Sequence, residues 1–276
     1  MLTGSGILVS VLIRIKFLIR NRVLNKINKQ LKDNSDLILK QKSKLEEVNA
    51  SQNMFFSILS HDLRNPFNGI LGFLNILKND FDTLSTEERK QYIDYVNISA
   101  NQVFRLIERL LELARLKDGR YQFKFENVNI NEITEQVLQL QRTNTLNKKV
   151  TLENNISKDV FIYADKVSVD TILRNLTDNA IKFTPAGGKV SLESESKDEK
   201  VVIYVKDNGV GMDSEDMKNI FRLDKRITSK GTNDEKGTGL GLYVCKEMIE
   251  KMNGSIKVES VIGKGSTFVV TFPRKV

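Results

Sequence analysis

The stretch from Ile7 to Asn65 contains neither glycine nor proline, the two residues that most often interrupt a helix. Apolar residues recur along it at intervals of seven, which predicts a coiled coil. One row of the seam contains Phe17, Leu24, Leu31, Ile38 and Leu45, and the other contains Ile13, Ile27, Val48 and Phe55, interrupted by Arg20, Asn34 and Gln41. Because polar seam residues fix the register while weakening the coil, residues 17–50 are predicted to be a signalling helix that shifts between arrangements.

The first sixteen residues combine a short apolar run with basic residues. The run from Ile7 to Ile13 is too short to cross a bilayer, which takes about twenty apolar residues. Arg14 and Lys16 follow it, as basic residues follow the cytoplasmic end of a membrane helix. Residues 1–16 are therefore expected to be either the remnant of a membrane helix or a leader that runs into a soluble helix.

Charge and cysteine content exclude several classes of protein. Residues 1–50 carry ten lysines and arginines against four acids, which is most of the net charge of +8. No basic patch interleaved with aromatic residues accompanies them, so a membrane surface is a better partner than nucleic acid. A single cysteine, Cys245, and a single histidine leave no disulfide framework and no Cys/His metal cluster to propose, which fits a reducing, cytoplasmic setting.

Residues 51–119 are predicted to form a helical hairpin. Apolar residues spaced by threes and fours run from Phe55 to Leu77, and the pattern stops at the sequence KNDFDTLS. Ser85 and Glu88 have the spacing of a capping box ahead of a second apolar run, which ends near Gly119. Because such a hairpin cannot cover its own seams, we expect two copies to pair into a dimeric four-helix bundle.

After Gly119 the sequence alternates short strand-like runs with helical ones. Runs such as KVVIYVKD and GSTFVVTF are interspersed with helical stretches near residues 130–146, 165–182 and 240–253. Strands interleaved with helices and paired as hairpins predict an α+β fold, in which helices cover one face of a sheet as an α/β sandwich. Residues 120–276 are therefore expected to form a second domain.

His61, the only histidine of the chain, lies in the sequence SHDLRNP. On an ideal helix it points away from the apolar stripe of Leu59 and Leu63, which argues against a core histidine and leaves a surface residue or a nucleophile. Pro66 cannot bond the carbonyl of Asp62, so the helix is expected to bend or loosen beside His61. A carboxylate at Asp62 can hold the imidazole tautomer and accept a proton, which leaves the other ring nitrogen free to attack.

Three later segments carry residues suited to a nucleotide, although each also has an ordinary structural explanation. Asn175, Asn179 and Lys182 share one helix face, where amide oxygens suit Mg²⁺ and an ammonium suits phosphate. Asp207 precedes the glycines of DNGVGM, where a carboxylate at a strand end can accept a hydrogen bond from an adenine amine. The glycine turn GTGLGL opens a helix toward a phosphate chain, and the polar residues 213–236 before it predict a mobile lid.

In this order the segments resemble the catalytic core of the sensor histidine kinases of bacterial two-component systems, over roughly residues 50–276. SHDLRNP is similar to the phosphoacceptor box of that family, NLTDNAIKF to its N box, and DNGVGM, GTGLGL and GKGSTF to its glycine boxes. The residues Ile220 to Arg222 resemble its F box, but the basic sequence that follows leaves the phosphate contacts of the lid open. The resemblance implies a dimerisation and phosphotransfer hairpin, a Bergerat-type ATP-binding domain, and ATP with Mg²⁺.

The resemblance also implies roles for individual residues. It assigns phosphoryl transfer to His61, with Asp62 as base or orienter and Asn65 orienting a water during dephosphorylation of a partner regulator. It assigns Asn175 and Asn179 to Mg²⁺ and phosphate, Lys182 to phosphate, and Asp207 to adenine. The other nucleotide-binding residues that it implies are Phe183, Gly209, Gly211, Phe221, Gly237, Thr238, Gly239, Leu240, Gly241 and Thr267.

The expected function is autophosphorylation of His61, followed by phosphoryl transfer to an aspartate in the receiver domain of a response regulator. The expected location is the cytoplasmic side of the inner membrane, with contact to the membrane only through the full-length protein. One alternative is a nucleotide-binding signalling scaffold or phosphatase without kinase activity. Another, an ATP-hydrolysing machine of the gyrase or chaperone type, conflicts with Asn175, which stands where those ATPases carry a water-activating glutamate.

Overall fold

The computed structural model describes residues 3–274 apart from 198, 223–230, 234 and 236–238. In the first helix, the side chains of residues 3–15, 19, 23 and 47–62 also lie outside the description. The chain divides into two compact units, Met1–Phe56 and Ser57–Val276.

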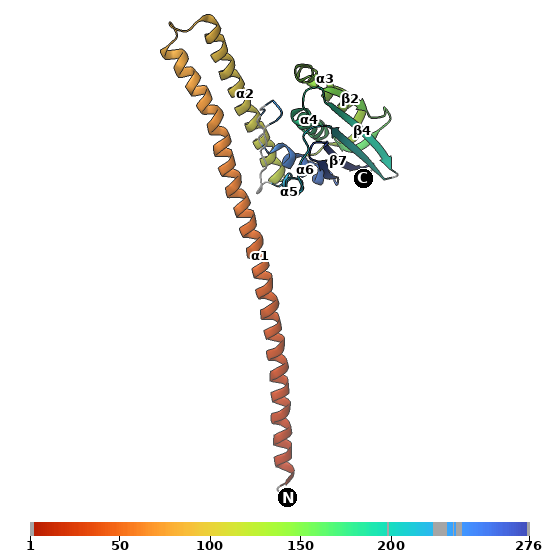
Figure 1. Ribbon diagram of the computed structural model, residues 1–276. Helices are drawn as coiled ribbons and strands as arrows, with labels where there is room; N and C mark the ends of the chain where they lie inside the picture. Colours follow the sequence, from red (N-terminus) through yellow and green to blue (C-terminus); the bar gives the residue numbers. More distant parts are fainter. Residues whose placement is uncertain (1–2, 198, 223–230, 234, 236–238, 275–276) are drawn as a thin grey trace. The chain divides into compact units, whose positions relative to one another are not determined.

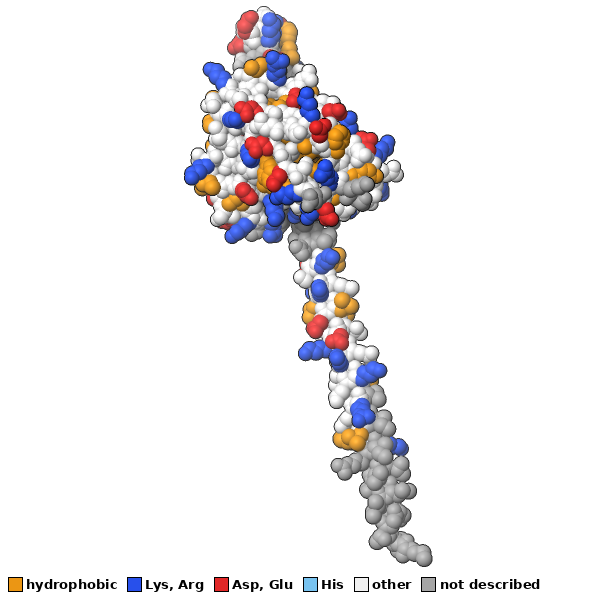
Figure 2. Space-filling model, turned by 90° about the vertical axis from the view of Figure 1, so that its right-hand side faces the viewer, with side chains coloured by type: hydrophobic (Ala, Val, Ile, Leu, Met, Phe, Trp, Pro, Cys, Tyr) orange, Lys and Arg blue, Asp and Glu red, His pale blue; other side chains and the backbone are white. Residues whose placement is uncertain are grey.

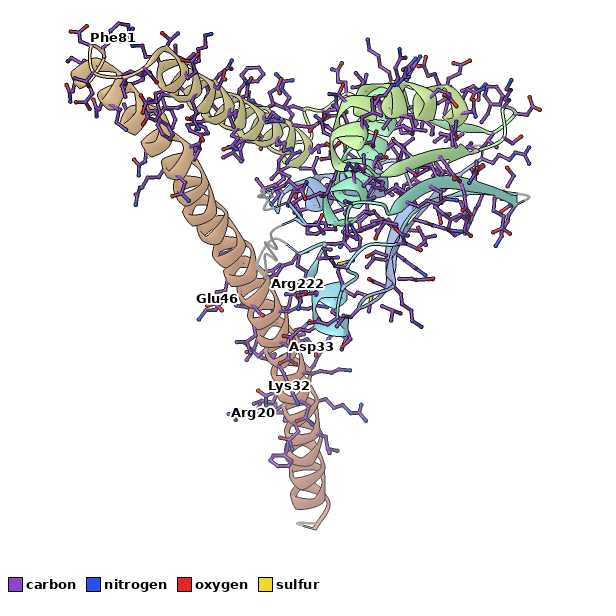
Figure 3. The ribbon with its side chains drawn as sticks, turned by 45° about the horizontal axis from the view of Figure 1, so that its top comes forward. Arg20, Lys32, Asp33, Glu46, Phe81 and Arg222 are labelled. Atoms are coloured by element: carbon purple, nitrogen blue, oxygen red, sulfur yellow. The ribbon has the colours of Figure 1, made fainter. Side chains whose placement is uncertain are left out.

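The first unit consists of the N-terminal part of helix α1 (Thr3–Asn79). Its described heptad residues are exposed, with Phe17 at 61%, Leu31 at 62% and Leu45 at 61% of their full accessibility. Apolar and basic side chains alternate along this segment in Figure 2, and Figure 3 labels Arg20 and Lys32 on it. Exposed apolar rows on a helix this long are typical of a coiled coil that requires a partner. Over the residues that the structure describes, no helix is long and apolar enough to cross a membrane.

The second unit begins with a helical hairpin made of the end of α1 and helix α2 (Thr86–Lys117). The predicted capping box is confirmed, since the Ser85 hydroxyl accepts a hydrogen bond from Glu88 N and the Glu88 carboxylate accepts one from Ser85 N. At the turn, the guanidinium of Arg89 lies 4.3 Å from the ring centroid of Phe81, which Figure 3 labels. The predicted end of α2 is also confirmed, because Gly119 follows with a φ of 66°.

Helix α1 is helical across Pro66, so the missing N–H does not end the helix. Whether the helix loosens around the carbonyl of Asp62 stays a prediction, because the side chains on that turn lie outside the description.

The rest of the second unit is an α+β domain built on a five-stranded mixed sheet (Figure 1). The strand order is β2-β4-β5-β7-β6, with β2 parallel to β4 and the other pairs antiparallel. These strands are β2 (Thr151–Asn155), β4 (Lys189–Lys197), β5 (Lys200–Asp207), β6 (Ser255–Val261) and β7 (Gly265–Pro273). The predicted α+β class is confirmed.

The helices α3 (Ile130–Lys148), α4 (Lys166–Phe183) and α6 (Gly241–Lys251) pack against this sheet. The apolar face that they cover contains Leu192, Val205 and Phe268, which are cross-strand neighbours and are buried. Alternation along a strand puts every second residue on this face, so Asp207 at the end of β5 shares it with Val205.

Two elements differ from the sequence-based expectation. The strand β3 (Phe161–Asp165) pairs with β1 (Phe125–Asn129) as a separate two-stranded sheet, although the sequence analysis assigned no strand there. Its five residues are too few for alternation to stand out. The helix α5 (Ser214–Asn219) lies within the predicted lid, and none of its six residues is buried. The Asp213 side chain caps it by accepting hydrogen bonds from Glu215 N and Asp216 N, so the helix has a cap but no apolar face that the sequence could reveal.

Candidate nucleotide-binding site

Helix α4 brings the polar residues of NLTDNAIKF to one face. Asp165 caps the helix by accepting a hydrogen bond from Ser168 N at 2.8 Å, and the buried residues Ile172, Leu173 and Leu176 fix the helix in the domain core. Asn175 and Asn179 are half-buried on the polar side. The Asn175 amide nitrogen donates to Thr171 O at 2.9 Å, so the side-chain oxygen points away from its own helix backbone.

Lys182 lies at the C-terminal end of the same helix. Burial lowers the pKa of Lys182, and the nearby carboxylate of Glu235 partly opposes that shift. Its ammonium lies 4.7 Å from the ring centroid of Phe183, the next residue. A half-buried ammonium with lowered pKa is a charge that an anionic ligand would stabilise.

Asp207 supplies a half-buried carboxylate at the end of the central strand β5. Its Oδ1 accepts hydrogen bonds from Gly209 N at 2.9 Å and Ser266 N at 3.1 Å. Burial raises the pKa of Asp207, while these two N–H donors act in the opposite direction. Within the described part of the chain, no donor reaches Oδ2, which leaves one oxygen available to a ligand amine.

The glycines after Asp207 let two backbone segments approach closely. A Cβ on Gly209 would lie 2.3 Å from the carbonyl oxygen of Phe183, and Val210 N donates to that same oxygen at 3.1 Å. Gly211 has a φ of 70°, and a Cβ there would lie 2.1 Å from Val261 O. No other residue fits either position without a backbone shift, so the turn is specific for glycine.

Ser266 is a residue of this site that the sequence analysis missed. It is buried beside Asp207, and its hydroxyl is 2.9 Å from the Ser260 hydroxyl, which also accepts from Met212 N at 2.8 Å. Thr267, the predicted hydroxyl contact, is the cross-strand neighbour of Lys206 and therefore lies on the other face of the pleat from Asp207. Strand alternation from the buried Phe268 would have indicated Ser266, because residues 266 and 268 share one face.

The second glycine turn leads into helix α6. Leu240 is buried, Gly239 has a φ of 64°, and a Cβ on Gly241 would lie 2.8 Å from Asn175 Oδ1. The N-terminus of α6 therefore lies against the polar face of α4, where its free N–H groups favour an anion. The predicted residues Gly237 and Thr238 lie outside the described residues.

The two ends of the predicted lid are anchored to this domain. Before residues 223–230, the half-buried ring of Phe221 meets Phe268 edge-on, with centroids 6.3 Å apart. After them, Thr232 N donates to Lys182 O at 3.1 Å, and the buried Lys148 ammonium donates to the same oxygen at 2.6 Å. Lys148 also forms a 2.8 Å ion pair with Glu235. The two residues are 87 positions apart in the sequence, and no sequence pattern predicted the pair.

A cluster of charged residues connects helix α2 to α4. Arg109 Nη2 donates to Asn175 Oδ1 at 3.3 Å, and Asp178 lies close enough to act on the pKa of Arg109. Burial raises the pKa of Asp178, while the positive charges of Arg109 and other arginines act to lower it. Gln141 donates a hydrogen bond to the Asp178 carboxylate. Neither Arg109 nor Asp178 was predicted to be functional, because charged residues on helices are usually solvated.

The phosphoacceptor candidates lie on α1. The side chains of His61 and Asp62 are outside the described residues, and Asn65, one turn later, is exposed.

The α+β domain holds the half-buried Asp207 between glycine turns of a mixed sheet, and helices cover one face of that sheet. These features define a candidate nucleotide-binding domain, which a helical hairpin precedes. The family profile described as "His Kinase A (phospho-acceptor) domain" matches residues 51–119. The profile for "Histidine kinase-, DNA gyrase B-, and HSP90-like ATPase" matches residues 164–276. The chain belongs to the sensor histidine kinases of two-component systems, a class of ATP-dependent protein kinases.

Individual relatives agree with this assignment. The chain is 31% identical over 229 residues to the autoinducer 2 sensor kinase/phosphatase LuxQ of Vibrio harveyi, covering 80% of this chain and 26% of LuxQ. The structure of full-length ShkA in complex with AMPPNP is similar with a TM-score of 0.58 and 28% identity, over 79% of this chain and 45% of ShkA.

A third relative agrees at the level of the fold. Histidine kinase ThkA in complex with the response regulator protein TrrA gives a TM-score of 0.63 at 24% identity, over 80% of this chain and 61% of ThkA. The chain spans about a quarter of the length of the curated relatives it matches.

Proposed function

We propose that residues 51–276 catalyse ATP-dependent autophosphorylation of His61 and pass the phosphoryl group to an aspartate of a response regulator. The observation that carries this proposal is the Asp207 carboxylate. One of its oxygens is fixed by two backbone N–H groups and the other is left for a ligand, beside glycine turns that no larger residue fits. In the same chain, the only histidine lies in the segment that matches the phospho-acceptor domain.

The residues present fit a nucleotide triphosphate. Asp207 Oδ2 would accept the adenine amine, and the backbone at Gly209 and Gly211 would lie against the ring. Lys182 and the N-terminus of α6 at Gly241 would face the phosphates. Phe183, Phe221, Gly239 and Leu240 surround the same region, and Gly237, Thr238 and Thr267 stay sequence-based proposals.

We assign Mg²⁺ to the side-chain oxygens of Asn175 and Asn179, which face the polar side of α4. The cation would neutralise charge on the β- and γ-phosphates. The Asn175 oxygen accepts a hydrogen bond from Arg109, which must be released before that oxygen can bind a cation.

The proposed reaction is a phosphoryl transfer to nitrogen. A ring nitrogen of His61 forms a bond to the γ-phosphorus while the bond to the β,γ-bridging oxygen breaks and ADP leaves. Asp62 orients the imidazole and accepts the ring proton. The carboxylate of the regulator aspartate then attacks phosphorus and releases His61. In a separate phosphatase reaction, Asn65 would orient the water that attacks the aspartyl phosphate and releases inorganic phosphate and the free aspartate. The name of LuxQ records a phosphatase activity for that protein.

Asn175 argues against an ATP-hydrolysing machine. Its amide cannot remove a proton from water, and both of its polar atoms already make hydrogen bonds within the protein. ATP is therefore expected to persist until His61 arrives as nucleophile.

The proposed organisation follows the sequence-based boundaries. Residues 1–16 are assigned to a membrane-helix remnant or leader, 17–50 to a coiled-coil signalling helix, 51–119 to the hairpin and 120–276 to the ATP-binding domain. Exposed apolar residues on both hairpin helices, Phe67, Leu71, Ile98, Phe104 and Leu111 among them, support a homodimeric four-helix bundle. The full-length protein is proposed to work at the cytoplasmic side of the inner membrane.

Labelled ATP tests this proposal. The wild-type chain should acquire acid-labile label from γ-labelled ATP, and His61→Gln should lose it while still binding ATP with unchanged affinity. Acid-labile label that survives in His61→Gln would refute the assignment of His61. A wild type that binds ATP but never acquires label would favour the signalling scaffold instead.

A further inference from the structure

Arg109 of α2 donates a hydrogen bond to α4 and so reaches the polar face that carries the proposed nucleotide residues. The Asn175 amide nitrogen is held by the carbonyl of Thr171, so its oxygen has a fixed direction. That direction leads to Arg109 Nη2 at 3.3 Å and to Gly241 at the start of α6. A cation from the hairpin therefore occupies the oxygen that the proposed function gives to Mg²⁺.

Arg109 is held in this place by opposite charge. Asp178 on α4 and Glu112 on α2 both favour its charged form, while burial disfavours it and Arg105 repels it. Asp178 is in turn fixed by a hydrogen bond from Gln141 of α3. The guanidinium is thus an ordered part of the contact between α2 and the ATP-binding domain.

We propose that Arg109 fastens α2 to the ATP-binding domain by taking the place of the divalent cation at Asn175, so that binding of Mg·nucleotide and this docked arrangement oppose each other. The proposal rests on the proposed function, which assigns Asn175 to Mg²⁺. An amide oxygen has two lone pairs, but a guanidinium and a divalent cation on one oxygen would be only a few ångströms apart and would repel strongly.

Linkage makes the effect reciprocal. If Arg109 weakens the binding of Mg·nucleotide by some factor, Mg·nucleotide must weaken the docking of α2 by the same factor. Mg·nucleotide would then release the ATP-binding domain from the end of α2. The domain must be free to move in this way if it is to deliver a phosphoryl group to His61. Arg109 acts as a positioning residue in this scheme, because it touches Asn175 and not the reacting atoms.

Calorimetric titration of the full chain with AMPPNP tests the proposal, once with MgCl₂ and once with EDTA. The readout is the ratio of the two dissociation constants, because it isolates the cation from the rest of the nucleotide. We expect Arg109→Gln to tighten binding with Mg²⁺ about tenfold, equivalent to about 1.4 kcal/mol, and to leave binding in EDTA unchanged. Arg105→Gln is the matched control, since it removes the same charge one helical turn away without contact to Asn175, and its ratio should stay within about twofold of wild type.

A second variant covers the risk that Arg109→Gln destabilises the half-buried Asp178 carboxylate by removing a nearby positive charge. The double variant Arg109→Gln with Asp178→Asn removes both charges and should show the same tightened ratio. The reciprocal effect is measured with spin labels on cysteines introduced at the exposed residues Gln102 and Lys200. Mg·AMPPNP should broaden their distance distribution in the wild type, and AMPPNP in EDTA should not.

Three results would overturn the inference. An unchanged ratio in both Arg109 variants would show that the cation and Arg109 do not compete. Weaker Mg·AMPPNP binding would show instead that Arg109 contacts the phosphates. A wild type that binds no nucleotide would refute the proposed function and this inference with it, whereas an unchanged ratio leaves the proposed function intact.

Discussion

Replacing Asp207 by asparagine is expected to weaken nucleotide binding without weakening the fold. The asparagine keeps an oxygen where Oδ1 accepts hydrogen bonds from Gly209 N and Ser266 N. At the second position it puts an N–H₂ group in place of Oδ2. Because adenine presents an amine there in the proposed complex, the substitution sets donor against donor.

The magnitude follows from the lost hydrogen bond. A hydrogen bond with one charged partner contributes about 1.5–3 kcal/mol. Since 1.4 kcal/mol is a factor of about ten, the dissociation constant for AMPPNP should rise about 10- to 150-fold. The base specificity should also relax, because the lost acceptor is the group that distinguishes an amine from a carbonyl.

Although Asp207→Asn should bind AMPPNP more weakly, its free energy of unfolding without nucleotide should not fall. Burial raises the pKa of Asp207 above its unfolded value of about 3.9, so the folded state holds its proton to higher pH than the unfolded state. The free energy of unfolding therefore falls as pH rises from the unfolded to the folded pKa, and at pH 7 this cost is fully present. Asp207→Asn removes it and should be at least as stable as wild type at neutral pH.

Calorimetry with AMPPNP and urea unfolding at pH 7 measure the two effects on one sample. Asp159→Asn, an exposed acid of the same domain, is the matched control and should change neither. An AMPPNP affinity of Asp207→Asn within about threefold of wild type would refute the assignment of Oδ2 to the adenine amine, because the smallest expected loss is about tenfold.

Three further substitutions test other parts of the site. Gly211→Ala should lower the free energy of unfolding by about 1–3 kcal/mol, because Gly211 has a φ of 70° and an added Cβ would meet the Val261 oxygen. Gly72→Ala is the control and should raise the free energy of unfolding by about 1 kcal/mol, because Gly72 lies in a helix with open space around it. Ser266→Ala should weaken AMPPNP binding more than Thr267→Ala, since only the former lies on the Asp207 face; equal effects in calorimetry would contradict the strand alternation. Lys148→Met should destabilise the domain in urea unfolding at pH 7, because it removes one hydrogen bond to a carbonyl and one ion pair.

The effect of Lys148→Met has a defined pH dependence. Burial alone would raise the pKa of Glu235, but hydrogen bonds from Lys148 and from Asn233 N outweigh it and lower that pKa. A lowered folded pKa contributes stability above the unfolded pKa, and that stability is lost as pH falls through the folded pKa. The stability difference between wild type and Lys148→Met should therefore shrink below about pH 4.3, the ordinary pKa of a glutamate. A difference that is constant from pH 7 to pH 3 would show that the ion pair contributes nothing.

Local sequence patterns predicted the parts of the fold that local physics controls. Ser85 and Glu88 are three residues apart, and their capping box depends only on the helix that they begin. The ends of α2 and the helices α3, α4 and α6 were predicted for the same reason. The strand β3 was missed because its pairing with β1 depends on a partner far along the chain, and five residues give too short a period to recognise.

The nucleotide-binding site shows the same division. Asp207 and its glycines were identified because their spacing within one turn is itself the signal. Arg109 and Asn175 are 66 residues apart, and Lys148 and Glu235 are 87 apart. Within its own segment, each of these four residues is of a type that usually lies on the surface. Only the packing of α2, α3 and α4 therefore reveals the two contacts. Thr267 was proposed in place of Ser266 for a smaller reason, because the strand face was not followed back from Phe268, which lies on the same face as Ser266.

Cys245 lies on α6, fully buried near Arg109, and this placement has a practical consequence. Burial raises the pKa of its thiol to about 12. At pH 8 only about one part in 10⁴ is thiolate, the form that reacts with maleimides and methanethiosulfonates. Cys245 should therefore react very slowly with thiol reagents. A cysteine introduced on the surface can then be labelled selectively without first replacing Cys245.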